Sequence, residues 1–249
     1  MKITTVTVDF WGTLLIDPPS SDDRYKRRRM EEFEQILVGA GLKISRRALD
    51  AGYEASGTYL ARTWRDHRDV SVEHHVSAIL AAADRDLPRR IAPTVMGELV
   101  DAYSRPALLV PPDVDPGARL AMETLVARGY TLAVVSNTMR TPGAVLRKLL
   151  ERYGLLQFFK HTTFSDEVGV RKPAPEIFAL TLRALGAQPS AAVHVGDDAT
   201  LDVRGARAAG MRAIHVTSAP ARSPAELTAD AIIPTLRELP AAVARIDAS

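Results

Sequence analysis

The second half of the chain alternates short β-branched runs with helices whose ends are marked, and this alternation constrains the fold most. The runs predict strands because they are short, apolar and rich in β-branched residues. They cover residues 131–136, 161–165, 191–196 and 212–217. Proline opens and glycine closes the helices between them, as at Pro175 and Gly186. Alternating strands and helices predict an α/β fold with a Rossmann-like parallel sheet that carries helices on both faces.

Residues 20–104 follow a different pattern, with long helical periodicity and no convincing strand. The helical stretches cover roughly 22–39, 46–67, 72–84 and 91–104. Prolines at 18–19, 106 and 111–112 mark the edges of this region, because helices do not continue through them. With 249 residues, the chain is long for one compact core. The sequence therefore predicts a core domain, 1–17 with 108–249, and an α-helical domain inserted at 18–107.

Composition excludes several classes of partner and chemistry. The chain has 32 Lys and Arg residues against 30 Asp and Glu residues. It therefore has no strong positive electrostatic field that would favour nucleic acid as a partner. The chain has no cysteine, which excludes disulfides and thiolate chemistry. No apolar run is long enough to span a bilayer, and the N-terminus leaves no room for a signal peptide. We expect a cytoplasmic monomer or homodimer that binds neither nucleic acid nor membrane.

Polar residues stand where the predicted strands end. Asp9 follows the apolar run 3–8, Ser136 and Asn137 end the next strand, and Asp166 follows the third. The fourth strand ends in Gly-Asp-Asp at 196–198. Each residue alone is typical of a turn. In an open parallel sheet, however, ligands bind beyond the carboxyl ends of the strands, so these side chains predict one site.

Four segments together resemble the haloacid dehalogenase superfamily. They are DFWGTL from Asp9, VVSN at 134–137, GVRKPAPEIF around Lys172, and VHVGDDATLDV at 193–203. Single motifs of this length are weak, but four in order at predicted strand ends are a strong signal. The resemblance implies a hydrolase, and it implies that the helical insertion is the cap domain that many members carry after the first motif.

The resemblance also implies the roles of the site residues. Asp9 would be the nucleophile that forms an aspartyl-phosphate, because a carboxylate divides one hard displacement into two easier ones. Lys172 would offset the repulsion between carboxylate and phosphate, while Thr13 and Ser136 would donate hydrogen bonds to the phosphate. Trp11, Gly12 and Asn137 would line the substrate site. For Thr13 and Ser136 the alternative role is local backbone bonding at a turn, and for Trp11 it is packing in the core.

A magnesium ion is the implied cofactor, because Mg²⁺ prefers hard oxygen ligands. Its ligands would be Asp9, the backbone carbonyl of Trp11, Asp197 and Asp202. In the family's fourth motif the two acids stand five positions apart, as Asp197 and Asp202 do. Asp198 is expected instead to begin a helix, where an acid suits the helix dipole.

Trp11 departs from the pattern, since phosphatases of the family carry a second aspartate there to move protons. Tryptophan cannot do this, because its indole nitrogen only donates. We therefore expect a magnesium-dependent phosphatase-type hydrolase acting on a small phosphorylated metabolite. A 2-haloacid dehalogenase-like hydrolase is one alternative, because those members carry an aromatic residue there and need no metal. A catalytically impaired protein that binds a ligand or partner is the other. His74, His75 and the basic cluster 24–29 are candidate replacements for the acid.

Overall fold

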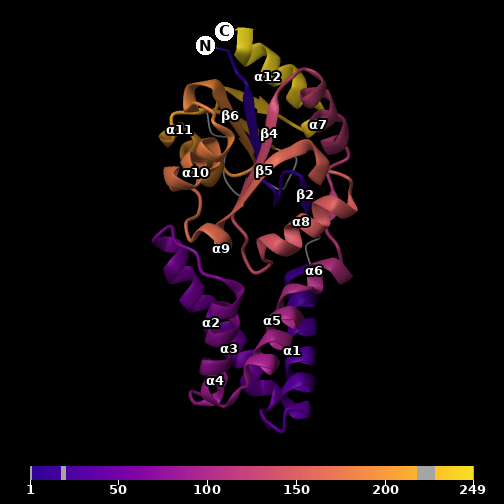
Figure 1. Cartoon of the computed structure of the whole chain (residues 1–249), viewed down its shortest axis with the longest axis vertical. Coiled ribbons are helices and arrows are strands. Elements are labelled where there is room, and N and C mark those ends of the chain that lie inside the picture. The colour runs from indigo at the N-terminus through magenta and orange to yellow at the C-terminus, as the bar shows by residue number, and fades with distance from the viewer. Residues whose placement is uncertain (1, 18–20, 218–227, 249) are drawn as a thin grey trace.

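The computed structural model describes residues 2–17, 21–217 and 228–248. A parallel sheet with its helices forms the upper part of the molecule, and long helices form the lower part (Figure 1). The described strands of the sheet run in the order β5-β4-β1-β6-β7-β8. Their bounds are β1 Thr5–Val8, β4 Thr131–Ser136, β5 Phe159–Phe164, β6 Ala192–Gly196, β7 Arg212–Val216 and β8 Ala231–Ile233. The predicted parallel α/β fold is confirmed, and β8 adds an edge strand that was too short to predict.

Strand β1 lies in the middle of the sheet. Val8 pairs in parallel register with Val134 of β4 on one side and with Val195 of β6 on the other. The residues that follow these three strands therefore emerge at the same edge. This register places Asp9, Ser136 and Asp197 within reach of one another.

Helices cover both faces of the sheet, as the sequence predicted. Side chains alternate between faces along a strand, so Val134 packs in one apolar cluster and Val135 in another. The first cluster includes residues of α7 (Ala118–Ala127), α8 (Gly143–Arg152) and α12 (Leu239–Ala248). The second includes residues of α10 (Pro175–Leu185) and α11 (Gly205–Ala208). Shorter segments are α9 (Ser165–Val168), η1 (Leu156–Phe158), η2 (Pro189–Ala191), η3 (Ala199–Arg204) and η4 (Leu236–Glu238).

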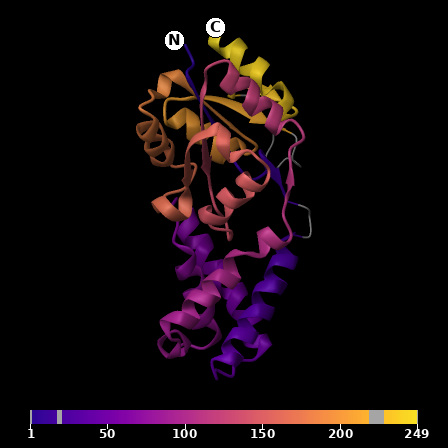
Figure 2. The same ribbon diagram turned by 45° about the vertical axis from the view of Figure 1, so that its right-hand side comes forward.

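The lower part of the molecule, which we call the helical unit, consists of helices (Figure 2). It has an apolar cluster of its own. It consists of α1 (Ser21–Gly39), α2 (Arg46–Arg65), α3 (Val72–Ala83), α4 (Leu87–Arg90) and α5 (Pro93–Ser104). Phe33, Leu80 and Leu99 are fully buried in that cluster. The helix predicted at 91–104 begins instead at Pro93, because a proline suits the first helical turn and cannot donate to a preceding one.

The two connections to the helical unit are paired. Strands β2 (Leu15–Ile16) and β3 (Asp113–Val114) are antiparallel, and α6 (Pro106–Leu109) follows α5. The predicted edge at 18–19 lies outside the described residues, and the domain bounds 1–17, 18–107 and 108–249 remain a prediction. Among the described helices, none combines the length and apolarity that a bilayer crossing needs.

His75 is buried in the helical unit, where its Nδ1 lies 3.1 Å from the hydroxyl of Tyr103. Burial, together with the nearby cations Arg140 and Arg29, lowers the pKa of His75 to about 3. In the unfolded chain a histidine titrates near pH 6.5. Acid therefore protonates the unfolded chain before the folded one, and stability falls as the pH falls below 6.5.

We expect wild-type protein to lose about 2 kcal/mol more stability between pH 7 and pH 5 than His75→Gln does. Urea unfolding at both pH values measures this difference. His74→Gln is the matched control, because His74 is the exposed neighbour on the same helix. Equal losses in wild type and His75→Gln would contradict the prediction.

Candidate active site

Asp9 lies directly after β1 and is buried at the edge of the sheet. Its Oδ1 accepts a hydrogen bond of 2.7 Å from the Ser136 hydroxyl at the end of β4. The same oxygen lies 2.7 Å from Nζ of Lys172. Burial raises the pKa of Asp9, and the charge of Lys172 opposes that effect only in part. Two strand ends and the loop before α10 thus meet at one carboxylate.

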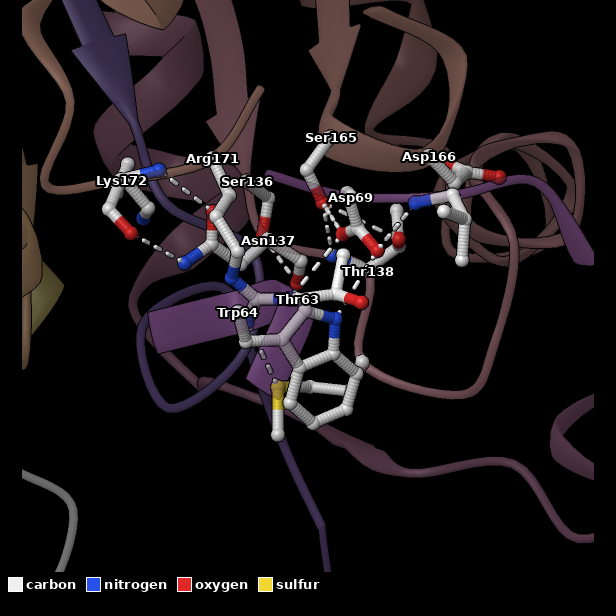
Figure 3. Close-up of polar contacts among 12 residues, drawn as sticks. Thr63, Trp64, Asp69, Ser136, Asn137, Thr138, Ser165, Asp166, Arg171 and Lys172 are labelled. Carbon is white, nitrogen blue, oxygen red and sulfur yellow. Dashed lines mark hydrogen bonds and ion pairs between the residues drawn. The ribbon is translucent and has the colours of Figure 1, made fainter. Parts of the chain in front are cut away.

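The backbone of Lys172 is held by Asn137, as Figure 3 shows. The Asn137 amide nitrogen donates to the Lys172 carbonyl at 3.1 Å, and the Lys172 N–H donates to Asn137 Oδ1 at 2.9 Å. Both polar atoms of the Asn137 side chain are therefore used to position the lysine. In this structure Asn137 contacts Lys172 rather than the cavity described below.

Asp202 is the second partner of Lys172, at 2.5 Å from Nζ. His194 Nε2 lies 3.0 Å from the same oxygen, and Asp198 N–H donates to the other at 2.9 Å. Although burial raises the pKa of Asp202, Lys172 and His194 outweigh it and hold that pKa below its usual range. The sequence analysis did not predict a role for His194. The signal that the sequence offers is a histidine placed between two valines on a buried strand. Its Nδ1 lies 2.8 Å from the Thr7 hydroxyl.

Asp9, Asp197 and Asp202 form a cluster of three buried carboxylates. Each offers an oxygen within 4.8 Å of the others, the spacing of ligands around one ion. The donors are all carboxylate oxygens, which are the hard ligands that Mg²⁺ prefers. Three carboxylates against the single charge of Lys172 leave an excess of negative charge. The donor set therefore fits a divalent cation.

Two glycines make room for this cluster. A Cβ at Gly12 would overlap the carboxylate of Asp197, and a Cβ at Gly196 would overlap that of Asp202. Gly12 also has φ +77°, a conformation that side chains rarely adopt. The turn 9–15 is closed by Leu14 and Leu15 N–H groups that both donate to the Phe10 carbonyl.

Trp11 and Thr13 lie in that turn and are both buried. The Trp11 ring meets Phe10 edge-on at 4.9 Å between centroids. Its Nε1 and the Thr13 hydroxyl are buried without a hydrogen-bond partner in the structure. Buried donors are nearly always bonded, so both groups are suited to bond a ligand.

The remaining acidic residues at strand ends are structural. Asp198 accepts from the N–H groups of Thr200 and Leu201 at 2.8 Å each and so begins the next helical turn, as predicted. Asp166 accepts from Gly143 N–H at 3.2 Å and closes the turn before α8. Burial raises the pKa of Asp166 to about 6.

A second network joins the site to the helical unit (Figure 3). Asp69, in the loop after α2, accepts from Ser165 at 2.5 Å, Arg171 at 3.1 Å and Trp64 at 3.0 Å. Ser165 in turn accepts from the N–H of Thr138 at 2.9 Å. Arg171 precedes Lys172 and Thr138 follows Asn137, so Asp69 braces both loops that carry the site. No motif pointed to Asp69.

Backbone pairing strengthens the same contact. Arg171 N–H donates to the His67 carbonyl at 3.1 Å, and Asp69 N–H donates to the Gly169 carbonyl at 3.2 Å. Arg68 and Val170 form an antiparallel bridge between them. We call this contact, residues 67–69 with 169–171, the bridge.

A cavity of about 660 Å³ adjoins Trp11 and Gly12 and extends between the core and the helical unit. Of the basic cluster proposed from sequence, Lys26 and Arg29 line it, together with Arg140 from the loop after β4. His75 is buried elsewhere, and His74 is exposed and lies 2.9 Å from Ser71. Neither histidine lines the cavity. Arg140 was not predicted.

Comparison with known proteins gives the family. A model described as haloacid dehalogenase-like hydrolase matches residues 3–210. A phosphoserine phosphatase of Thermus thermophilus is 35% identical over 148 residues, 59% of this chain and 57% of that protein. The chain spans between 52% and 61% of the first curated relatives. The human haloacid dehalogenase-like hydrolase domain-containing protein 3 is 33% identical over 249 residues, covering 96% of this chain and 93% of that protein.

Solved structures share the fold. A 2-haloacid dehalogenase from Pseudomonas syringae pv. Tomato DC3000 matches with a TM-score of 0.70 at 23% identity, covering 98% of this chain and 99% of that one. A HAD phosphatase from Thermococcus onnurineus matches with a TM-score of 0.59 at 27% identity, covering 95% and 96%. The first likeness shows the fold alone, because the identity is low.

We expect Gly12→Ala to lose about 1–3 kcal/mol more stability than Gly129→Ala. Both glycines have strongly positive φ, +77° and +86°, so both variants strain the backbone. Only at position 12 does the new Cβ also meet a buried carboxylate; at Gly129 it meets nothing. Urea unfolding measures both losses of stability. Similar values would contradict the prediction, because they would show that the Asp197 carboxylate moves away from the methyl group without cost.

Proposed function

This chain belongs to the haloacid dehalogenase-like hydrolases, and on that premise we propose that it is a magnesium-dependent phosphatase of a small phosphorylated metabolite. The observation that carries the proposal is the cluster of Asp9, Asp197 and Asp202. A hydrolase that attacks the carbon of a haloacid needs no cation at this place. Three carboxylates around one lysine suit a site that binds Mg²⁺ and phosphate together.

Asp9 is the nucleophile in this proposal. Among the described residues, the partners of its carboxylate contact Oδ1, so we assign the attack to Oδ2. Oδ2 forms a bond to phosphorus as the bond to the leaving oxygen breaks, which gives an aspartyl-phosphate. Water then attacks that phosphorus and restores the Asp9 carboxylate with release of phosphate.

Lys172 and Ser136 orient the attacking carboxylate through Oδ1. Lys172 also supplies positive charge next to the incoming phosphate. The Thr13 hydroxyl, which has no hydrogen-bond partner among the described residues, can donate to that phosphate. Bound through Asp9, Asp197, the Trp11 carbonyl and Asp202, Mg²⁺ would stabilise the charge that develops on the phosphoryl oxygens. His194 holds Asp202 in place through the contact between its Nε2 and Oδ1 of Asp202.

Trp11 limits which substrates the site can serve. Its Nε1 can donate a hydrogen bond to a leaving oxygen but cannot give up the proton. Substrates whose leaving group departs as an anion, such as aryl or acyl phosphates, need no proton at that step. The aromatic residue at this position favours the second candidate, a 2-haloacid dehalogenase-like enzyme, and no turnover at all would favour a binding protein.

A substrate panel separates the three candidates. We expect purified protein to release phosphate from aryl and acyl phosphates with Mg²⁺, to stop when the metal is chelated, and to release no halide from 2-haloacids. Asp9→Asn should lower turnover by more than about 10³-fold, because an amide is a poor nucleophile. Asp166→Asn is the matched control, since Asp166 is a half-buried aspartate that closes a turn.

Metal-independent release of halide would replace the proposal with the dehalogenase. Full activity in Asp9→Asn would remove Asp9 as the attacking group.

Restoring an aspartate at position 11 tests the role of the acid that Trp11 replaces. We expect Trp11→Asp to raise turnover of alkyl phosphates by at least about 10-fold, because a positioned general acid is typically worth about 10²–10⁴-fold. Trp11→Phe is the control, since it keeps an aromatic ring without a titratable group. Phosphate release in the steady state measures both. Rapid alkyl turnover in wild type that Trp11→Asp only impairs would show that another residue carries the proton.

A further inference from the structure

Two arginines meet in the cavity beside Trp11. Arg29 comes from α1 of the helical unit and Arg140 from the loop after β4. Arg29 Nη2 donates to the backbone carbonyl of Arg140 at 2.9 Å. The side chains of both arginines contact Tyr53 and Tyr103. Only 2% of Arg29 is exposed.

The partners of these arginines are neutral. Arg29 donates to the Tyr103 carbonyl at 2.8 Å and to the Tyr53 hydroxyl at 3.0 Å. Arg140 donates to the Ser56 and Tyr103 hydroxyls, at 3.2 Å each. The rings of Tyr103 and Tyr53 lie 4.3 Å and 4.1 Å from the two guanidinium carbons and hold them in place.

The other buried cations, in contrast, have carboxylate partners. Arg171 pairs with Asp69, and Lys172 pairs with Asp9 and Asp202. Among the buried arginines and lysines of the described residues, Arg29 alone has no carboxylate partner. A buried charge without a counter-ion is costly. An anion that enters the cavity would remove that cost.

The cavity extends from these cations to Trp11 and Gly12, in the turn that follows Asp9. Trp11 and Gly12 line it as well as both arginines, and its volume of about 660 Å³ suits a small metabolite. Where the family's usual acid would repel an anion, Trp11 presents a buried donor that bonds to no other residue in the described part of the chain. Four acids also line the cavity. Glu54 pairs with Lys26, and the other three are Asp17, Asp22 and Asp23.

We infer that Arg29 and Arg140 bind a second anionic group of the substrate, a carboxylate or a second phosphate. The substrate is then a small phosphorylated molecule with two anionic ends. The phosphoryl end lies at Asp9 and Lys172, and the other end lies between the arginines. This inference rests on the proposed function for the phosphoryl end alone.

Binding of inert analogues tests it without turnover. The probes share a three-carbon chain: propylphosphonate with one anionic group, 3-phosphonopropionate with a carboxylate added, and propane-1,3-bisphosphonate with a second phosphonate. We expect wild type with excess Mg²⁺ to bind at least one of the two-ended probes about 10- to 100-fold tighter than propylphosphonate, measured by calorimetry. Which of the two binds tighter distinguishes a carboxylate from a phosphate.

Arg29→Met should reduce that preference to about twofold or less, with propylphosphonate affinity unchanged. Arg28→Met is the matched control, because Arg28 is the exposed neighbour on the same helix and should keep the full preference. If Arg29→Met does not fold, Arg140→Gln decides the question from the other side of the cavity.

A wild type without preference, or a preference that survives both substitutions, overturns the inference, and so does failure of every probe to bind. A different outcome is that a two-ended probe binds in an arginine-dependent way while propylphosphonate does not bind. This result would contradict the proposed function and support the anion site.

Discussion

The charge of one buried lysine between two carboxylates is the interaction on which this site depends. Lys172 lies 2.7 Å from Asp9, which follows β1, and 2.5 Å from Asp202, which lies in η3 after the neighbouring strand β6. Without it, two buried carboxylates would face each other, and one would take up a proton. With it, Asp202 is held strongly acidic, while burial still raises the pKa of Asp9. The lysine therefore keeps Asp202 ionised although it is buried, and it offsets part of the cost of a charge on Asp9.

The position of that lysine depends in turn on groups from distant parts of the chain. Asn137 uses its whole amide to hold the Lys172 backbone. Asp69 then holds the neighbouring Arg171 and, through Ser165, the N–H of Thr138. A residue of the helical unit thus stabilises loops of the core. Loops held by side chains at both ends are preorganised, and preorganised charge is the main source of electrostatic catalysis.

Sequence predicted the sheet and the strand-end residues well, because both follow from local patterns. β4 has the predicted bounds, and Asp9 and Ser136 meet where parallel strands end. It missed β8, which is only three residues long. It also missed Asp69, Arg29 as an individual cation and Arg140. These residues act through contacts between segments far apart in the chain, and no local pattern encodes such contacts.

The bridge between residues 67–69 and 169–171 has a consequence for evolution and for protein engineering. Insertions joined only at their two ends can be exchanged between relatives as modules. Here the insertion is also attached through noncovalent contacts, and at the bridge Asp69 and the His67 carbonyl complete the core's own loop. A chimera that grafts a foreign insertion onto this core would leave Arg171 without its counter-charge. Recombination that preserves the site must therefore carry the two segments together, although about 100 residues separate them.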